Sequence, residues 1–366
     1  MLTPFDDSLH HQIPTTFDHA GTSDPRFYDR HWFAAYDPDG GGAIQTTLAM
    51  YRNMNVADGA LAAIIGDSQH NVRFSRTLRP DFETRCGALS VEVRRPMEEL
   101  RIGLEESNGM SADLTWTATH PPQEEMPHFE RHRGRVLQDY TRFNQIGRMD
   151  GVVRAQGQEL QVSNWWACRD HSWGVRPGMG LSEPHTGEKR RLDEDGFFMV
   201  FLFFSAGDFA GDLHLSYRGE QRTYLNAAIR RSDELLDVID CEAVPNFFPG
   251  TRRVQSLQIN LALPDRDLVL VCDALGSSIA MPGIGYSGGY DDRKGLGVWR
   301  GEISEGETWS VADPAVVSDE SGRNWTPWHR IQPVVVTLQG ESGSDSRGTG
   351  SLTAIASGSL PQYGLT

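Results

Sequence analysis

Residues 165–176 read Trp-Trp-Ala-Cys-Arg-Asp-His-Ser-Trp-Gly-Val-Arg, the densest run of aromatic and ionisable side chains in the chain. In a β-strand, successive side chains point to opposite faces. One face of such a strand would carry Trp165, Arg169, His171 and Trp173. The other face would carry Trp166, Asp170 and Ser172. An imidazole beside an indole, with a guanidinium two residues earlier, suits proton transfer in an apolar cavity; a core strand with structural ion pairs is the alternative.

Strand patterns continue on both sides of this stretch. Apolar and polar residues alternate at 89–93, 100–104, 114–119, 257–263 and 268–272, with turn residues between the runs. Helical periodicity is scarce, and we expect short helices only within 24–35 and 135–143. The 38 glycines and 19 prolines supply the many turns that short strands require. We therefore predict an all-β protein with few short helices.

The segment 120–128, which reads His-Pro-Pro-Gln-Glu-Glu-Met-Pro-His, interrupts the strand pattern. Apolar strand pairs with a polar turn occur on both sides of it, at 91–102 and at 259–270. A chain of 366 residues also exceeds the usual size of a single core. We predict two antiparallel β-barrel domains, residues 1–130 and 131–366, with the 169–174 motif in the second domain near the junction.

The composition excludes several classes of partner. A formal net charge of −16 opposes binding to nucleic acid and to an anionic membrane surface. The most apolar run, 197–204, is far shorter than the ~20 residues of a membrane-spanning helix, and the first residues lack the pattern of a secretory signal. The four cysteines are widely spaced, without a Cys-x-x-Cys pair, which favours a reducing compartment. We expect a cytoplasmic protein with no nucleic-acid partner and no membrane insertion.

Two further stretches offer ligand contacts. Residues 51–59 would place Tyr51, Asn53 and Asn55 on one face of a strand, either lining a wet cavity or exposed on an antiparallel strand before a turn. Residues 283–295 form a glycine-rich loop that lacks the Gly-Lys-Ser/Thr ending of a phosphate loop. This loop is either a mobile lid that brings Tyr290 and Arg293 to a ligand or a solvated hairpin loop.

Metal and cofactor signatures are missing from the sequence. The histidines at 10, 11, 128 and 132 lack zincin spacing and lie in polar stretches that we expect to be exposed. There is no Gly-x-Ser-x-Gly nucleophile elbow and no dinucleotide fingerprint. We expect no metal and no cofactor.

The motif at 169–174, Arg-Asp-His-Ser-Trp-Gly, follows a segment at 143–153 that reads Phe-Asn-Gln-Ile-Gly-Arg-Met-Asp-Gly-Val-Val. Together they resemble the hydroxyneurosporene synthase (carotenoid 1,2-hydratase) superfamily, over about residues 27–336. The resemblance implies two consecutive lipocalin-like (calycin) β-barrels. It also implies that His171 and Trp173 match a His-x-Trp pair implicated in protonating an isoprenoid double bond. The superfamily's Tyr-x-Asp pair on a following strand is absent here, where residues 197–201 read Phe-Phe-Met-Val-Phe.

The leading hypothesis is a cofactor-independent acid–base enzyme, a lyase, hydratase or cyclase, acting on a hydrophobic small molecule in an enclosed cavity. His171 would donate or accept the proton, because its ordinary pKa lies near neutral pH. Trp173 would stabilise a developing cation through its ring, and Arg169 would hold an oxygen of the substrate. Asp170, on the opposite face, would orient Arg176 or a neighbouring backbone group. Trp165 would contribute to the substrate-binding wall.

Other hypotheses are a lipocalin-like carrier without catalysis and a structural protein with filled barrels. A carrier needs no titratable group in its cavity, whereas a buried His171 that points into the cavity would favour an enzyme. The resemblance suggests a terpenoid substrate, and the aromatic side chains with arginine suggest a phenolic or phenylpropanoid compound. The sequence leaves a homodimer open.

Overall fold

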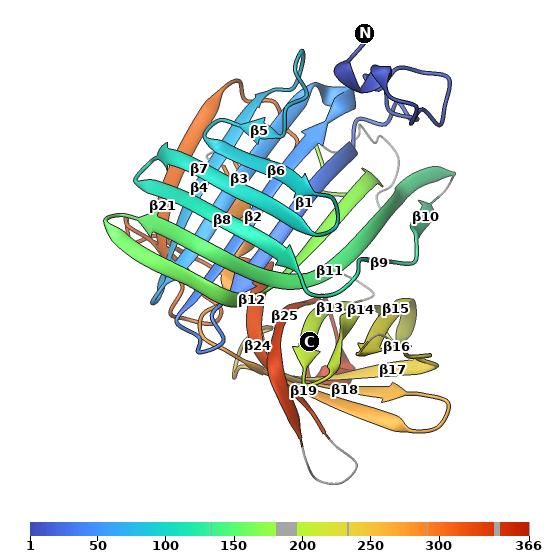
Figure 1. The fold of residues 1–366 in the computed structure, drawn as a ribbon. Helices are drawn as coiled ribbons and strands as arrows, with labels where there is room; N and C mark the ends of the chain where they lie inside the picture. Colours follow the sequence, from blue (N-terminus) through green and yellow to red (C-terminus); the bar gives the residue numbers. More distant parts are fainter. Residues whose placement is uncertain (133, 181–195, 233, 291, 340–344, 366) are drawn as a thin grey trace.

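The computed structural model describes residues 1–132, 134–180, 196–232, 234–290, 292–339 and 345–365. In these ranges the chain is built from antiparallel strands, with four short 3-10 turns at Pro4–Asp7, Arg52–Met54, Met281–Ile284 and Pro361–Tyr363. Two large curled sheets result, the larger one above and the smaller one below in Figure 1. The prediction of an all-β protein is confirmed. Within the described ranges, no helix has the length and apolar character needed to cross a bilayer.

The larger sheet follows the order β23-β22-β21-β4-β3-β2-β1-β12-β11-β8-β7-β6-β5, and β9 and β10 also pair with β11. Its strands are β1 Phe27–Tyr36, β2 Gly42–Tyr51, β3 Val56–Ile65, β4 Ser68–Thr77, β5 Arg85–Cys86, β6 Leu89–Arg95, β7 Glu99–Ser107, β8 Met110–Ala118, β9 Gln123–Glu124, β10 His128–His132, β11 Arg135–Ala155, β12 Gln158–Val175, β21 Ile303–Ser310, β22 Val317–Asp319 and β23 Asn324–Trp325. The long hairpin of β11 and β12 runs along the side of this sheet that meets the smaller one (Figure 1).

The smaller sheet follows the order β16-β15-β14-β13-β25-β24-β19-β18-β17, and β20 pairs with β24. Its strands are β13 Phe197–Ala206, β14 Phe209–Arg218, β15 Gln221–Arg231, β16 Glu234–Leu235, β17 Asp240–Phe247, β18 Val254–Ala262, β19 Asp267–Ala274, β20 Ile279–Ala280, β24 Arg330–Leu338 and β25 Ser346–Ser357.

The two sheets do not divide the chain at residue 130, where the sequence suggested a domain boundary. The chain stays in the larger sheet through β12 and returns to it for β21 to β23. The Pro-rich segment 120–128 interrupts the pattern because β9 and β10 are short strands that add to β11. The helices expected within 24–35 and 135–143 are also wrong. These residues form β1 and the start of β11, because pairing with β12 on both sides outweighs local helical preference.

Three large apolar cores hold the molecule together. One fills the concave side of the larger sheet and includes Phe33, Leu61 and Trp116. A second fills the smaller sheet and includes Phe198 and Leu257. The third lies between the sheets, and its members include Trp32, Tyr36, Trp166, Phe203, Met281 and Ile331. The interiors of both curled sheets are therefore packed with side chains, and the junction between them remains as the place for a ligand.

Candidate functional site

The residues that face this junction follow from the register of β1, β12 and β11. Directly opposed residues in antiparallel strands share a face. Arg30 of β1, Ser172 of β12 and Arg142 of β11 lie opposite one another in one row. Trp32, Asp170 and Asn144 form the next row on that face. The motif therefore presents its even-numbered residues to the smaller sheet.

An inner chamber of about 130 Å³ lies between the sheets, on this face. The larger sheet contributes Arg30, Trp32, Tyr140, Arg142 and Asp170 to its lining. Other lining residues include Arg176, Met199, Phe201, His214, Tyr286 and His329. Asp170 was expected to point away from the cavity, and this expectation is wrong. The alternation of side chains is as predicted, but the smaller sheet packs on the even-numbered face.

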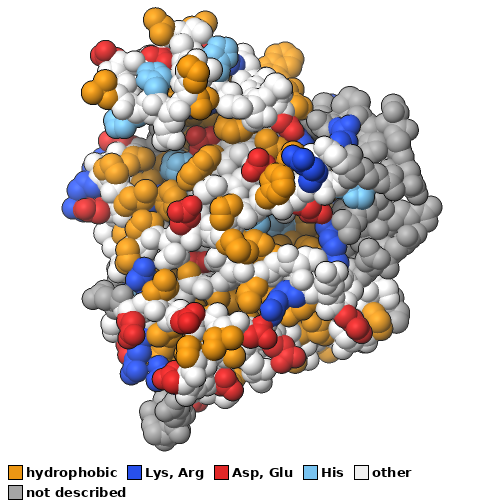
Figure 2. Space-filling view, turned by 90° about the vertical axis from the view of Figure 1, so that its right-hand side faces the viewer, with side chains coloured by type: hydrophobic (Ala, Val, Ile, Leu, Met, Phe, Trp, Pro, Cys, Tyr) orange, Lys and Arg blue, Asp and Glu red, His pale blue; other side chains and the backbone are white. Residues whose placement is uncertain are grey.

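A larger outer cavity of about 800 Å³ adjoins the chamber. Tyr140, Met199 and His214 line both spaces. The rest of the outer lining comes mainly from the segment around β10 and from β13, β14 and β15. These strands lie on the face of the molecule drawn in Figure 2, where hydrophobic side chains spread among acidic and basic ones and some histidines are visible. A ligand could therefore extend from the chamber past His214 to the outer cavity.

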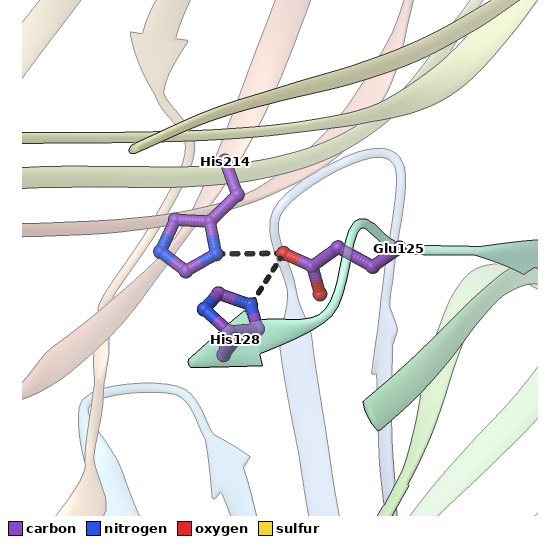
Figure 3. Close-up of side chains that lie close together, drawn as sticks. All are labelled: Glu125, His128 and His214. Carbon is purple, nitrogen blue, oxygen red and sulfur yellow. Dashed lines mark hydrogen bonds and ion pairs between the residues drawn. The ribbon is translucent and has the colours of Figure 1, made fainter. Parts of the chain in front are cut away.

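A buried cluster of Glu125, His128 and His214 adjoins the two spaces, because His214 lines both and His128 lines the outer one. Figure 3 shows how the three side chains lie. His214 of β14 has its Nδ1 atom 2.7 Å from Oε1 of Glu125, which follows β9 directly. His128 of β10 has its Nε2 atom 3.2 Å from the same oxygen. The His128 ring stacks between those of Tyr140 and Tyr224, with centroids 4.3 and 4.2 Å away. The carboxylate thus holds the His214 imidazole by a hydrogen bond, whereas the His128 ring is held mainly by its stacking in an aromatic wall.

Arg142 sets the charge of this cluster. Its guanidinium donates from Nε to Oε2 of Glu125. Burial alone would raise the pKa of Glu125, but Arg142 and the two histidines outweigh burial and hold that pKa well below its ordinary value. Burial lowers the pKa of His214, and it lowers the pKa of His128 to about 4. Nδ1 of His214 lies near two groups, Glu125 Oε1 at 2.7 Å and the donor Arg142 NH2 at 3.1 Å. Of the two, the closer contact to the ionised carboxylate favours the Nδ1–H tautomer, in which Nδ1–H donates to Glu125 and Nε2 on the far side of the ring is left as a base.

The same three side chains have the donor types of a metal site, with ligand atoms within 4.8 Å of one another. Two histidines and a carboxylate are a common set for a divalent transition metal. Here the cluster already holds a cation: Arg142 binds Glu125, and its NH2 lies 3.1 Å from His214 Nδ1. A divalent ion would have to bind beside that guanidinium. The charge arrangement favours proton transfer over metal binding.

Asp212 lies close to the cluster on β14, two residues before His214. Its Oδ2 accepts hydrogen bonds from Asn144 at 2.9 Å and from Asn226 at 3.3 Å. Burial, with a further contribution from the charge of Glu125, raises the pKa of Asp212 to about 8. A carboxyl group that is largely protonated at neutral pH therefore lies beside an ionised one. Such divergent pKa values are typical of acid–base sites and also occur in structural networks.

The odd-numbered residues of the motif lie on the other face of β12, against the concave side of the larger sheet. His171 Nε2 is 2.8 Å from Asp29 Oδ1. The His171 ring is 4.2 Å from that of His31 and 5.3 Å from that of Trp173. The His171 side chain is 25% exposed, and Trp173 is an exposed residue. His171 and Trp173 are in contact, as their spacing predicts, but they face away from the chamber.

Arg169 and Trp165 share that odd-numbered face. Arg169 is buried and donates from Nε and NH2 to Gln145 Oε1, at 3.0 and 2.6 Å. Its guanidinium lies over the rings of Trp116 and Phe143, 4.7 and 4.9 Å from their centroids. Trp165 belongs to the apolar core of the larger sheet. Both side chains are thus occupied by structural contacts, and their predicted roles in substrate binding stay predictions.

The polar stripe predicted at 51–55 does not form. Tyr51 ends β2 and donates its hydroxyl to Asp58 at 3.2 Å. Residues 52–54 form a 3-10 turn, in which Asn53 caps the carbonyls of Thr22 and Asp24. Asn55 has a left-handed backbone with φ of 57° and accepts a hydrogen bond from the Arg79 N–H. A turn breaks the period of two, so the three side chains do not share a face.

The glycine-rich loop at 283–295 brings one of its two predicted contacts into the interior. Tyr290 is buried and donates its hydroxyl to the carbonyl of Phe74 at 3.0 Å, while Arg300 lies over its ring at 3.8 Å. Arg293 is exposed. These contacts anchor Tyr290 against β4, where it does not line the chamber.

Sequence reasoning missed the Glu125–His128–His214 cluster. His128 was considered as a metal ligand but was expected to be exposed, and it is buried. The signal for His214 was present in β14, where Asp212, His214 and Ser216 alternate with Leu213 and Leu215 on a strand next to the most apolar run of the chain. Glu125 lies in a Pro-rich segment with no periodicity, and only the pairing of β9 and β10 with β11 places it at the junction.

The fold and cavity define a double-sheet, lipocalin-like all-β protein. The chain belongs to DUF8625, a family of unknown function, whose model matches residues 2–365. No curated protein matches the chain in sequence.

Solved structures with a similar fold include the crystal structure of CghA, at 10% identity and a TM-score of 0.50, covering 91% of this chain and 89% of that one. The structure of CghA with Sch210972 has 12% identity, a TM-score of 0.50 and the same coverage. Kievitone hydratase from Nectria haematococca has 12% identity and a TM-score of 0.48, covering 90% of this chain and 89% of that one. The comparison with CghA confirms the predicted fold of curled antiparallel sheets.

Proposed function

We propose that this protein is an acid–base enzyme of the hydratase, lyase or cyclase type, acting on a hydrophobic small molecule between the two sheets. The observation that supports this most is the position of the Glu125–His214 pair, where the inner chamber meets the outer cavity. A carrier would need no imidazole paired with a buried carboxylate at that position.

His214 would act as the general base or acid through Nε2. Glu125 would fix the Nδ1–H tautomer and stabilise the imidazolium that forms when Nε2 takes a proton. The rings of Tyr140, Phe201 and Tyr224 around the cluster would stabilise positive charge that develops on an apolar substrate. This chemistry would need no cofactor, because proton transfer by His214 and stabilisation of charge by the surrounding aromatic rings are sufficient for adding or removing water or for closing a ring.

The test is a substitution pair assayed on a substrate found by metabolite profiling of a deletion strain. His214→Phe should lower turnover by ~10²–10⁴-fold while ligand binding persists, because a proton-transfer group typically contributes that much. Glu125→Gln should lower turnover as well, since the neutral amide no longer stabilises the imidazolium.

The variant His171→Phe distinguishes His214 from His171, which the sequence suggested as the acid–base residue. The His171–Asp29 pair, with Nε2 and Oδ1 2.8 Å apart, is also a plausible acid–base pair. Loss of turnover in His171→Phe with full turnover in His214→Phe would move catalysis to the odd-numbered face. Full turnover in both variants would exclude both acid–base assignments.

A further inference from the structure

Arg30 is a buried arginine whose guanidinium forms no close ion pair with a described residue. It lies in the middle of β1, is 2% exposed, and lines the inner chamber. Its Nε and NH1 atoms are buried and have no hydrogen-bond partner in the part of the chain that the structure describes. Its guanidinium carbon lies over the ring of Tyr286, 5.1 Å from the ring centroid. Burying an unpaired charge is costly, so this arrangement calls for a ligand.

The nearby carboxylates are occupied elsewhere. Glu125 binds Arg142 and His214. Asp58 accepts hydrogen bonds from Tyr51 and from the Gly297 N–H. Asp170 accepts one from Ser172 at 3.3 Å. Arg30 forms no close ion pair with these acids, although it shares the chamber with Asp170 and its charge acts on Asp58 at longer range.

The chamber as a whole carries excess positive charge. Three guanidinium groups line it, those of Arg30, Arg142 and Arg176, against the carboxylate of Asp170 and the nearby one of Glu125. Burial, with smaller contributions from nearby arginines, lowers the pKa of His329 to about 3, so this imidazole is neutral. Arg176 also has a buried Nε without a partner in the described ranges, and its guanidinium lies 5.1 Å from the ring centroid of Tyr28.

We propose that the inner chamber binds an anionic oxygen group of the ligand, a carboxylate or an enolate, with Arg30 as its main contact and Arg176 as the second. This inference rests on the proposed function in using the same cavity, and it specifies the substrate class: an amphipathic acid with an apolar body. The chamber, at about 130 Å³, accommodates a head group of a few atoms, close to the ~150 Å³ that holds one benzene ring. The apolar body extends past His214 to the outer cavity.

The binding test uses two probes of equal shape, trans-cinnamate and its neutral amide, cinnamamide. Each is titrated calorimetrically into the full-length protein at pH 7. The wild type should bind cinnamate at least tenfold more tightly than cinnamamide. Inorganic phosphate, titrated in parallel, should bind more weakly than cinnamate, because it lacks the apolar body.

Arg30→Met should abolish the preference for cinnamate, and Arg30→Lys should keep part of it. The control is Arg101→Met at an exposed arginine that pairs with Asp113 on the surface, and it should leave the preference unchanged. Without ligand, Arg30→Met should melt at a higher temperature than the wild type, since it removes an unpaired buried charge. If this variant fails to fold, the shift in wild-type melting temperature with each probe is the measurement, and cinnamate should give the larger shift.

Equal binding of the two probes by the wild type would overturn the proposal, and so would a preference that survives in Arg30→Met. Tighter binding of phosphate than of cinnamate would show a site for a free inorganic anion instead. His214→Phe distinguishes this inference from the proposed function. A variant that keeps both the cinnamate preference and full turnover contradicts the catalytic role of His214 and leaves the anion site in place.

Discussion

His171 and Asp170 are adjacent in the chain, yet they belong to different environments. The period of two correctly separated the odd-numbered from the even-numbered side chains of β12, as the pairing of Asp170 with Trp32 and of His171 with His31 confirms. It could not indicate which face meets the smaller sheet, because alternation is symmetrical between the two faces of a strand. The aromatic character of the odd-numbered face, which suggested a ligand cavity, reflects contacts with Phe143, His31 and Trp116.

Asp212 provides a pH-dependent test of the network around His214. Burial raises the pKa of Asp212 to about 8 in the folded protein, from an ordinary value of 3.8. The folded state therefore favours the protonated carboxyl, and the free energy of unfolding of the wild type falls as pH rises from about 4 toward 8. Asp212→Asn keeps the shape without the ionisation. The variant should therefore gain stability relative to the wild type as pH rises, by ~1.4 kcal/mol per pH unit at most.

The measurement is urea unfolding of both proteins at pH 5, 6, 7 and 8. Asp113→Asn serves as the control, because Asp113 lies on the surface, pairs with Arg101 and has a lowered pKa. Its stability difference from the wild type should stay constant over this range. A constant difference for Asp212→Asn as well would show that Asp212 is ionised in the folded protein throughout.

The β11–β12 hairpin is the element that brings the two faces into place. It spans Arg135–Ala155 and Gln158–Val175, and β12 pairs with β1 on its other side. Gly174, at the end of the motif, has φ of +132°, and a Cβ atom there would clash with the carbonyl oxygen of Asp139. This glycine permits the close approach of the two strands at the edge of the site.

Gly174→Ala should accordingly destabilise the protein by ~1–3 kcal/mol, from backbone strain and displacement of β11. The matched control is Gly157→Ala, in the turn of the same hairpin, where φ is +79° and no atom of the described residues lies within 4 Å of the added Cβ. Chemical denaturation of both variants checks this. An equal loss at both positions would mean that backbone strain alone, without the contact to Asp139, accounts for the effect.

At the scale of the whole molecule, the apolar core between the sheets makes them depend on each other. Trp32, Tyr36 and Trp166 of the larger sheet are buried against residues such as Phe203 and Ile331 of the smaller one. The full chain should unfold in a single transition, with tryptophan fluorescence and far-UV circular dichroism changing together.

A fragment of residues 1–180 should expose this core and bind 8-anilinonaphthalene-1-sulfonate strongly, because a large apolar patch is left uncovered. Size-exclusion chromatography and dye fluorescence test this expectation. A monodisperse fragment with native near-UV circular dichroism and little dye binding would show that the larger sheet folds independently.

The sequence predicts the all-β class, since that depends on local alternation. It does not predict the return of 303–325 to the larger sheet, or the meeting of Glu125 with His214 at a separation of 89 residues. These features depend on which strand edges pair over long distances, and period-two patterns carry no information about partners. The burial of the Arg30 guanidinium was equally invisible, because arginine is usually exposed and nothing in the alternation of β1 marks this one as buried.

The pairing of β21 with the edge of β4 also means that this edge stays unpaired during much of synthesis. Ser75 pairs with Ile303. Synthesis of the chain between these two residues takes on the order of 10–45 s at ~5–20 residues per second, and the edge of β4 is open during that time. An open edge is a site for pairing with other chains, and polar or charged side chains discourage that. β4 reads Ser-Gln-His-Asn-Val-Arg-Phe-Ser-Arg-Thr, and Arg73 later pairs with Glu305 and Glu307 of β21 at 3.5 and 2.9 Å. Arg73, a charge that discourages wrong pairing of the free edge during synthesis, is thus also the side chain that pairs with the correct strand.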